Sequence, residues 1–518
     1  MISSHEVRRA VAVVQRSGVA TDLEALLRPV EQGRPRALTV EAFLVGVLLT
    51  VRYRKSVTLT NVHDLLTREI SVSQQLELGY RRPGWGAGPA VTLRQVRYLL
   101  SALAARLDEA DMPAGPDDDP EPEARPTGSQ RSTLQSILDR LLAATMPRHV
   151  VHHGAYAVDE TAVQSWSRGN ASFDADASWG YRTANLGQTD NFFGYGVFAF
   201  TRVPAQGDQR DQAPVLTERI VVRPANADVV EPVLTEIDLL RGEGRPVTEI
   251  LADRAWSYKA ADRWAMELRT RGIEQTVDLH PQDARPQPLD GLVLLAGVPH
   301  CPFTPEADSM TAFPGKSASK KRKDDFRAAN DLREQFALRK VANADAAGRE
   351  RWQCPAVAGK VRCGRRPVST FLPSELPAVQ VPAAAAVVAS PKCCTQKSVT
   401  VPVTAQAKLR QRHYWGSAAW ETAYRRRTYV EGAFGNLKNR NAENVTRGWI
   451  QVVGIVKTSL MIAAAVAAAN LRLLRIWAAR TRDFEDPIAN AEPAFAGFEE
   501  LPAPVVEGDP SAGPPSTP

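Results

Sequence analysis

The sequence predicts an α/β protein with a helical N-terminal region and a large insertion before its last helices. Between residues 132 and 279, short apolar runs typical of strands alternate with helical periodicity. Residues from about 20 to 110 carry helical periodicity alone. Residues 280 to about 405 interrupt the alternation, because they are rich in Pro and contain all five cysteines.

The N-terminal region reads as several short helices. Thr39 is expected to cap the first long one, Thr60 to begin a shorter one, and Thr92 to precede a helix that carries Arg94 and Arg97. This pattern fits a helix-turn-helix-like module, in which Arg94 and Arg97 would contact DNA, and it equally fits any small helical bundle.

The charge of the chain is unevenly distributed. Lys and Arg number 64 against 58 Asp and Glu, a net charge of +6. Residues 108–123 and 483–518 each hold eight acids and neither Lys nor Arg, so the remaining 466 residues carry +22. This excess predicts a polyanionic partner, with nucleic acid first. We expect both acidic segments to be disordered, and the tail to compete with DNA for the basic surface.

The alternating region is expected to form a sheet with interspersed helices. The predicted strands are 155–158, 192–201, 219–222, 247–252 and 274–279, and the predicted helices are 134–144, 228–241 and 259–271. The first strand should end at Asp159 and the fourth at Asp253. We therefore expect both carboxylates on one rim of the sheet.

The most informative segment is YRRRTYVEGAFGNLK, residues 424–438. Tyr424, Arg427, Glu431 and Lys438 are separated by three, four and seven residues, so a helix turning about 100° per residue presents them on one face. A lone helix of this kind would be an ordinary solvated face with an Arg–Glu pair. Two strand-end aspartates upstream favour a site instead, because three carboxylates from two strands and a helix suit a pair of Mg²⁺ ions.

These motifs resemble a known family. The segments VDE (158–160) and LADR (251–254), together with Tyr-x2-Arg-x3-Glu-x6-Lys, are similar to those of the DDE transposases of bacterial insertion sequences, in the branch with the Tyr–Arg–Glu–Lys signature. The resemblance covers about residues 156–477. It implies a ribonuclease H-like core with an insertion before the last acid, and 177 residues separate Asp253 from Glu431.

The resemblance also implies roles for individual residues. Asp159, Asp253 and Glu431 would bind two Mg²⁺ ions, or Mn²⁺ in their place, while Tyr424, Arg427 and Lys438 would contact phosphates near the cleaved transposon end. The implied reaction is cleavage at the terminal inverted repeats and transfer of the 3′-hydroxyl into target DNA, by a homodimer at synapsis. Two alternatives remain: a ribonuclease H-like DNA nuclease without strand transfer, and a non-catalytic DNA-binding protein derived from a transposase.

Each aspartate has rivals. Glu160, Asp174 and Asp176 compete for the first position, and Asp159 is preferred because it directly follows the apolar strand. Asp278 competes for the second position. Asp253 is preferred because it follows the apolar run ILA and precedes an amphipathic segment.

Two further groups of residues suggest ligands. Cys301, Cys354, Cys363 and one of Cys393 and Cys394 could close a tetrahedral Zn²⁺ site, but the absence of CxxC spacing favours scattered reduced thiols.

Trp415 and Trp420 lie among basic residues just before the signature. They could stack on an unpaired nucleotide, or pack the insertion against the core. The run KSASKKRK (316–323) reads as a flexible phosphate-contacting loop or as a solvated charge run.

No secretory or membrane signal is expected. The N-terminus lacks the apolar core of a signal peptide, and the most apolar stretch, 460–469, is too short to span a bilayer. A cytoplasmic, nucleoid-associated bacterial protein is the simplest expectation. The expected divisions are a helical DNA-binding domain, an acidic linker, the first part of the catalytic core, a basic insertion, the last part of the core and an acidic tail, over residues 1–107, 108–130, 131–279, 280–407, 408–482 and 483–518.

Overall fold

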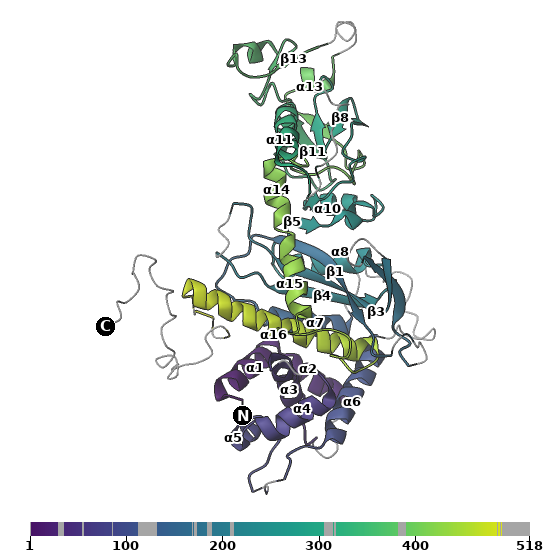
Figure 1. The fold of residues 1–518 in the computed structure, drawn as a ribbon, viewed down its shortest axis with the longest axis vertical. Helices are drawn as coiled ribbons and strands as arrows, with labels where there is room; N and C mark the ends of the chain where they lie inside the picture. The colour runs from purple at the N-terminus through teal and green to yellow at the C-terminus, as the bar shows by residue number, and fades with distance from the viewer. Residues whose placement is uncertain are drawn as a thin grey trace, which may run out of the picture.

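The computed structural model is elongated, with N-terminal helices at one end, a sheet in the middle and a small subdomain at the other end (Figure 1). It describes all residues except 1, 29–35, 54–55, 85, 87, 112–131, 168, 170–172, 184–188, 208–211, 305–313, 315–316, 382–389, 484, 487 and 489–518. Nearly all of the predicted acidic linker and most of the predicted acidic tail lie outside the described residues.

The N-terminal region is helical, as predicted. Its helices are α1 (Ser4–Ser17), α2 (Val19–Leu27), α3 (Val40–Arg52), α4 (Leu59–Asp64), the π-helical turn η1 (Leu65–Glu69), α5 (Val72–Glu77) and α6 (Leu93–Asp111). The expected start of the disordered linker at residue 108 is wrong, because α6 continues to Asp111, and the helix predicted over 134–144 is α7 (Thr133–Ala143). Thr39 caps α3, and the Thr92 hydroxyl accepts a hydrogen bond from the Gln95 N–H at the start of α6. The predicted start at Thr60 is wrong by one residue, because Thr58 caps α4 and the helix begins at Leu59.

The central region is a mixed α/β unit. Its strands are β1 (Ala155–Gln164), β2 (Ser178–Thr183), β3 (Thr189–Arg202), β4 (Thr217–Pro224), β5 (Glu249–Ala252) and β6 (Glu274–Val277), with α8 (Val230–Gly242), α9 (Arg254–Ser257) and α10 (Ala265–Thr270) between the later ones. Strands β3, β1, β5 and β6 lie side by side in that order, and β2 and β4 both pair with β3. The β1–β3 and β3–β4 pairs are antiparallel, whereas β5 and β6 run parallel to β1.

The first strand is longer than predicted. β1 continues to Gln164 because the 14-residue β3 supplies antiparallel partners along its whole length. The expectation that Asp159 ends a strand is therefore wrong. Asp159 lies within β1, opposite Ala199 of β3.

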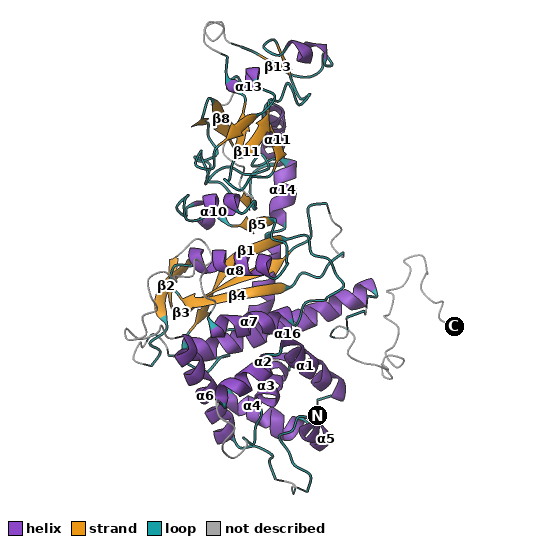
Figure 2. Cartoon of the chain, turned by 180° about the vertical axis from the view of Figure 1, so that it is seen from behind, coloured by secondary structure: helices purple, strands orange, loops and turns teal. Residues whose placement is uncertain are grey.

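Helices cover both faces of the sheet (Figure 2). On one face, α7, α15 (Thr428–Lys438) and α16 (Ile455–Thr481) enclose one apolar core with alternate residues of the strands. On the other face, α8 and α10 enclose a second core, which continues into the insertion. Because successive residues of a strand point to opposite faces, each strand contributes to both cores.

The last helix, α16, joins the N-terminal helices to the sheet. Figure 1 shows it lying between them, and it packs against α3, α6 and α7 as well as β4. One continuous apolar core includes residues of α1, α3 and α6 together with α16 and the sheet. By length and composition alone α16 could cross a membrane, but 78% of its most apolar window is buried in the fold, as in the core helix of a soluble protein.

The insertion consists of small sheets and short helices. They are β7 (Gln287–Leu289), β8 (Leu292–Leu295), β9 (Val298–His300), α11 (Lys320–Gln335), β10 (Arg339–Ala342), β11 (Glu350–Gln353), β12 (Arg362–Cys363), the 3₁₀ helix η4 (Pro367–Phe371), β13 (Ala378–Val379), α13 (Lys392–Thr395) and β14 (Val399–Val401), followed by α14 (Ala418–Arg425). The expectation of a loop is wrong for Lys320–Lys323, since Ser319 caps α11 there and Phe326 anchors the helix. Lys316 lies outside the described residues.

Asn470 ties α16 to the sheet. Its side chain is buried, donates to the Thr217 carbonyl (2.7 Å) and the Thr145 hydroxyl (2.9 Å), and accepts from the Thr217 N–H (3.0 Å). We predict that Asn470→Ala lowers the free energy of unfolding by about 2–4 kcal/mol, because backbone groups of β4 lose their partners inside the core. Urea denaturation measures this. The exposed Asn441→Ala should change stability by less than about 0.5 kcal/mol, and an equal effect of both variants would contradict the assignment.

Candidate active site

Two aspartates follow the last paired residues of neighbouring parallel strands. Val158 of β1 pairs with Ala252, the last residue of β5, so Asp159 within β1 and Asp253 directly after β5 occupy the next position on backbones about 4.8 Å apart. The Asp253 carboxylate accepts the Ala255 N–H at 2.9 Å and so caps the short helix α9. The Asp159 carboxylate accepts the N–H of the following residue at 2.8 Å.

Helix α15 brings a third carboxylate to the same place. It crosses β1 and β3, held by the buried side chains of Val430 and Leu437. Arg427, just before the helix, donates to Asp159 at 3.1 Å and also to Glu431, so one guanidinium bridges the two acids. The signature segment and the first aspartate, 268 residues apart in the chain, are therefore in direct contact.

The predicted single helix over residues 424–438 is divided in two. α14 ends at Arg425 and α15 begins at Thr428, with two residues in a turn between them. Arg426 and Arg427 keep helical φ and ψ angles, so the two helices follow nearly one path (Figure 1). Tyr424 consequently still reaches the site, and the Arg427 guanidinium lies 5.5 Å from its ring centre.

A cavity of about 440 Å³ opens beside the aspartates. Asp159, Glu160 and Asp253 line it together with three basic side chains, Arg182, Lys259 and Lys438. The sequence analysis placed Lys438 in the site but missed Arg182 and Lys259. Lys259 follows Asp253 by only six residues, a spacing that could have drawn attention to it. Nothing in the sequence connects Arg182 of β2 with the other strands.

The carboxyl groups are crowded. Burial raises the pKa of Asp159 to about 6, and the charges of Asp253 and Glu431 act in the same direction, against the Glu160 N–H and Arg427. Partial burial, with Asp159 and Asp253 nearby, raises the pKa of Glu160 to about 7 although Lys259 opposes it. The site therefore disfavours its own negative charge at neutral pH.

Lys438 and Tyr424 are affected as well. Burial, with Arg182 nearby, lowers the pKa of Lys438. Burial also raises the pKa of Tyr424, with Asp278 and Asp253 adding to the effect, so the phenol is a neutral hydrogen-bond donor at physiological pH. The site thus has charged and neutral donors close to its acids.

Three acids of the site carry the type of ligand atom that divalent cations bind. Asp159, Asp253 and Glu431 offer carboxylate oxygens, which hard divalent cations prefer. A cation bound beside Asp159 would lower the raised pKa of this residue, because it would stabilise the carboxylate form. Among the described residues, no group of three or more His, Cys, Asp or Glu side chains is placed so that it could hold a metal ion. Instead Arg427 bridges Asp159 and Glu431 and supplies part of the neutralising charge.

The rival acids have other partners. Glu160 leaves the opposite face of β1 from Asp159 and lies over Gly196 of β3, although it lines the same cavity. Asp174 is buried and accepts from the Tyr195 hydroxyl and the Gly454 N–H, while Asp176 accepts the Ile455 N–H at the start of α16. Both hold the N-terminus of α16.

The rival for the second position is also engaged. Asp278 accepts from Arg254 and from the Trp415 indole N–H at 2.9 Å. Of the two candidates, Asp253 is the one that lines the cavity with Asp159.

The two tryptophans pack in the core. Trp415 and Trp420 are 2% and 4% exposed, and the Trp420 indole donates to the Val277 carbonyl while its ring stacks on Tyr424 at 4.7 Å. The packing alternative therefore describes them, and stacking on a nucleotide is wrong for this structure. Arg94 and Arg97, in contrast, are exposed on α6, as a DNA contact requires.

The cysteines come from separate segments of the insertion, and all five are buried with free thiols. A side-chain hydrogen bond from Cys393, with burial opposing it, lowers the pKa of Cys301. Zn²⁺ binding by Cys301, Cys354, Cys363 and Cys393 stays a prediction, since no metal-binding group of three or more side chains is found in the described part of the chain.

The raised pKa of Asp159 makes a prediction about stability. Because the folded state disfavours the carboxylate, its contribution to stability is complete below the unfolded pKa near 4 and is lost as the pH rises through about 6. Asp159→Asn should therefore raise the free energy of unfolding by about 1–2 kcal/mol at pH 8 and not at pH 4. Denaturation at both pH values, without divalent cations, measures this; the exposed Asp262→Asn should show no pH-dependent gain. A gain independent of pH would refute the explanation.

No family model matches the chain, and no curated protein matches it significantly.

Proposed function

We propose that the protein is a DNA transposase of the DDE type, which cleaves DNA at transposon ends and transfers the 3′-hydroxyl into target DNA. One observation carries the proposal. Asp159 of β1 lies beside Asp253, which directly follows the adjacent parallel strand β5, and Arg427 of the Tyr–Arg–Glu–Lys signature joins Glu431 of α15 to Asp159. The spacing of the signature and the position of the aspartates are independent, yet they meet at one site.

The proposal includes a ribonuclease H-like core. Its support is the sheet, in which the antiparallel strands β1, β3 and β4 continue into the parallel strands β5 and β6. Helices cover both faces, and the last acid comes from a helix packed on the first strand. This arrangement is compatible with such a core.

Each residue of the site has a task in the proposed reaction. Asp159, Asp253 and Glu431 provide the negative charge that would hold two Mg²⁺ ions, or Mn²⁺. Bound there, the ions would activate water or a 3′-hydroxyl and neutralise the leaving oxygen. Arg427, Lys438, Lys259 and Arg182 provide cations for the phosphates next to the cleaved bond, and Tyr424 provides a neutral donor.

The crowding of carboxyl groups supports an enzyme over a binding module. Three acids with mutually unfavourable charges cost stability, and DNA itself would be repelled by them. A protein that only binds DNA gains nothing from such a cluster. The partner is expected to be double-stranded DNA, with a homodimer holding two ends together.

We predict that Asp253→Asn and Glu431→Gln each lower Mg²⁺-dependent cleavage of transposon-end DNA by about a thousandfold or more, because each removes a charge that holds the ions. Affinity for the uncut DNA should stay within a few-fold of wild type. The measurement is gel analysis of cleavage beside anisotropy for binding.

Glu231→Gln, an exposed acid on α8, is the matched control and should cleave normally. Wild-type rates from Asp253→Asn would overturn the assignment. If a pre-cut 3′ end is not joined to target DNA by the wild-type protein, the function is that of a nuclease without strand transfer.

Arg94 and Arg97 make a separate prediction for the helical region. If α6 contacts DNA, Arg94→Ala with Arg97→Ala should weaken binding and lower the slope of log affinity against log salt by about 1–2, as expected for one or two lost phosphate contacts. Lys at both positions keeps the charge and should keep most of the affinity. An unchanged slope in the alanine variant would show that α6 only packs.

A further inference from the structure

A second cavity, of about 570 Å³, lies where the N-terminal helices, α7 and the sheet meet. Five arginines line it, and none of its fifteen lining residues is acidic. They come from four separate places: Arg16 at the end of α1, Arg140 and Arg148 in and after α7, Arg202 at the end of β3, and Arg245 before β5. The chain thus brings five guanidinium groups together from segments up to 229 residues apart.

Two of these arginines share a carboxylate that lies behind the cavity wall. Glu218 is fully buried, accepts two hydrogen bonds from Arg202 and also contacts Arg245. The Tyr156 hydroxyl donates to the same carboxylate at 2.8 Å. Arg245 also pairs with Glu243 at 3.5 Å, and Arg140 pairs with Asp22 at 2.5 Å. Because a guanidinium has five N–H donors and each carboxylate accepts from one or two of them, donors remain for a ligand.

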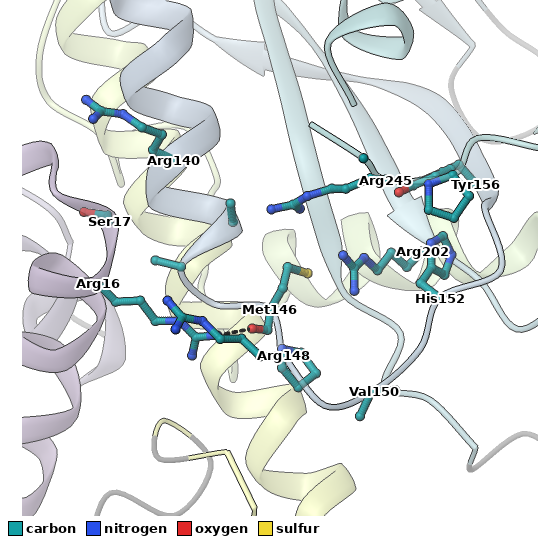
Figure 3. Close-up of a pocket in the computed structure, with 15 residues that line it drawn as sticks. Arg16, Ser17, Arg140, Met146, Arg148, Val150, His152, Tyr156, Arg202 and Arg245 are labelled. Atoms are coloured by element: carbon teal, nitrogen blue, oxygen red, sulfur yellow. Dashed lines mark hydrogen bonds between the residues drawn. The ribbon is translucent and has the colours of Figure 1, made fainter. Parts of the chain in front are cut away.

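The opposite rim already holds an oxyanion. The Asp486 carboxylate, at the start of the acidic tail, accepts from the Arg16 side chain at 3.1 and 3.2 Å and from the Arg148 backbone N–H at 3.2 Å. Asp483 contacts His149 at 2.9 Å, next to Arg148 in the chain and just outside the cavity lining. Figure 3 shows Arg16 and Arg148 on one side of the cavity and Arg202 and Arg245 extending toward it from the other.

The lining favours a phosphate group and offers no place for a base. Its aromatic rings are His152 and Tyr156, which pack edge to face at 4.7 Å, and Tyr156 is fully buried and so cannot stack on a nucleobase. Arginine forks match the geometry of phosphate oxygens. The backbone of Tyr156 lies only three residues before Asp159 on β1, about 10 Å along the strand, a distance that a DNA duplex spans in three base pairs, although the two side chains leave opposite faces of the strand.

We propose that this arginine cavity binds backbone phosphates of the DNA substrate, and that Asp483 and Asp486 compete with those phosphates for its rim. The proposal rests on the proposed function for the identity of the DNA, but the cavity and its acid segment are independent of the catalytic acids. It gives the first acids of the tail a defined contact surface. It also predicts that DNA binding extends beyond the catalytic cavity.

The test is anisotropy with a labelled duplex over a range of salt concentrations, without divalent cations. Arg148→Ala with Arg245→Ala should weaken binding about tenfold and lower the salt slope by about 2, whereas Lys at both positions should restore most of the affinity. Asp483→Asn with Asp486→Asn should tighten binding at low salt by a few-fold. Thermal melting identifies any variant that fails to fold, and Arg148→Ala alone then replaces the double variant.

Other outcomes are decisive too. Unchanged affinity and slope in folded arginine variants would overturn the proposal. Tight binding of inorganic phosphate or pyrophosphate that depends on Arg148, with DNA affinity unchanged, would make the cavity a small-anion site and overturn the DNA assignment. If the arginine variants weaken DNA binding while Asp253→Asn still cleaves DNA, the phosphate-binding role of the cavity is supported and the proposed catalytic function is wrong.

Discussion

The parallel pairing of β1 with β5 is the contact on which the candidate site depends. The register of Val158 with Ala252 decides that Asp159 and Asp253 are neighbours. A slip of one residue would send one of the two carboxylates to the opposite face of the sheet, away from α15. The two apolar cores that enclose the sheet specify this register, because alternate residues of both strands are buried on each side.

The acids of the site repel one another, and the packing of the surrounding elements holds them together. Burial and neighbouring charge raise the pKa of Asp159, and Arg427 relieves only part of the repulsion. Val430 and Leu437 hold α15 on β1 and so keep Glu431 near the other acids despite the unfavourable charge. Such a cluster, beside a cavity lined with basic side chains, is the observation that supports the proposed function.

Helix α16 connects the N-terminal helices with the sheet by packing against both. It buries one side against the N-terminal helices and another against the sheet, so the two share one apolar core. The same packing places the residues after α16 against α1 and the loop after α7, where Asp486 meets Arg16. The acidic tail therefore begins at the rim of a basic cavity, so segments of opposite charge meet there.

The sequence alone predicted much of the local structure and the members of the signature. Apolar runs located five strands, Thr39 and Thr92 marked helix starts, and the spacing of Tyr424, Arg427, Glu431 and Lys438 predicted that they act together. These properties depend on residues close in the chain.

Only the tertiary structure decided the length of β1, the burial of Trp415 and the arrival of Arg182 and Lys259 beside the acids. Each of these features depends on packing against residues far away in the sequence. Local periodicity predicts which residues share a face of a helix or strand, but not which distant residues will pack against that face.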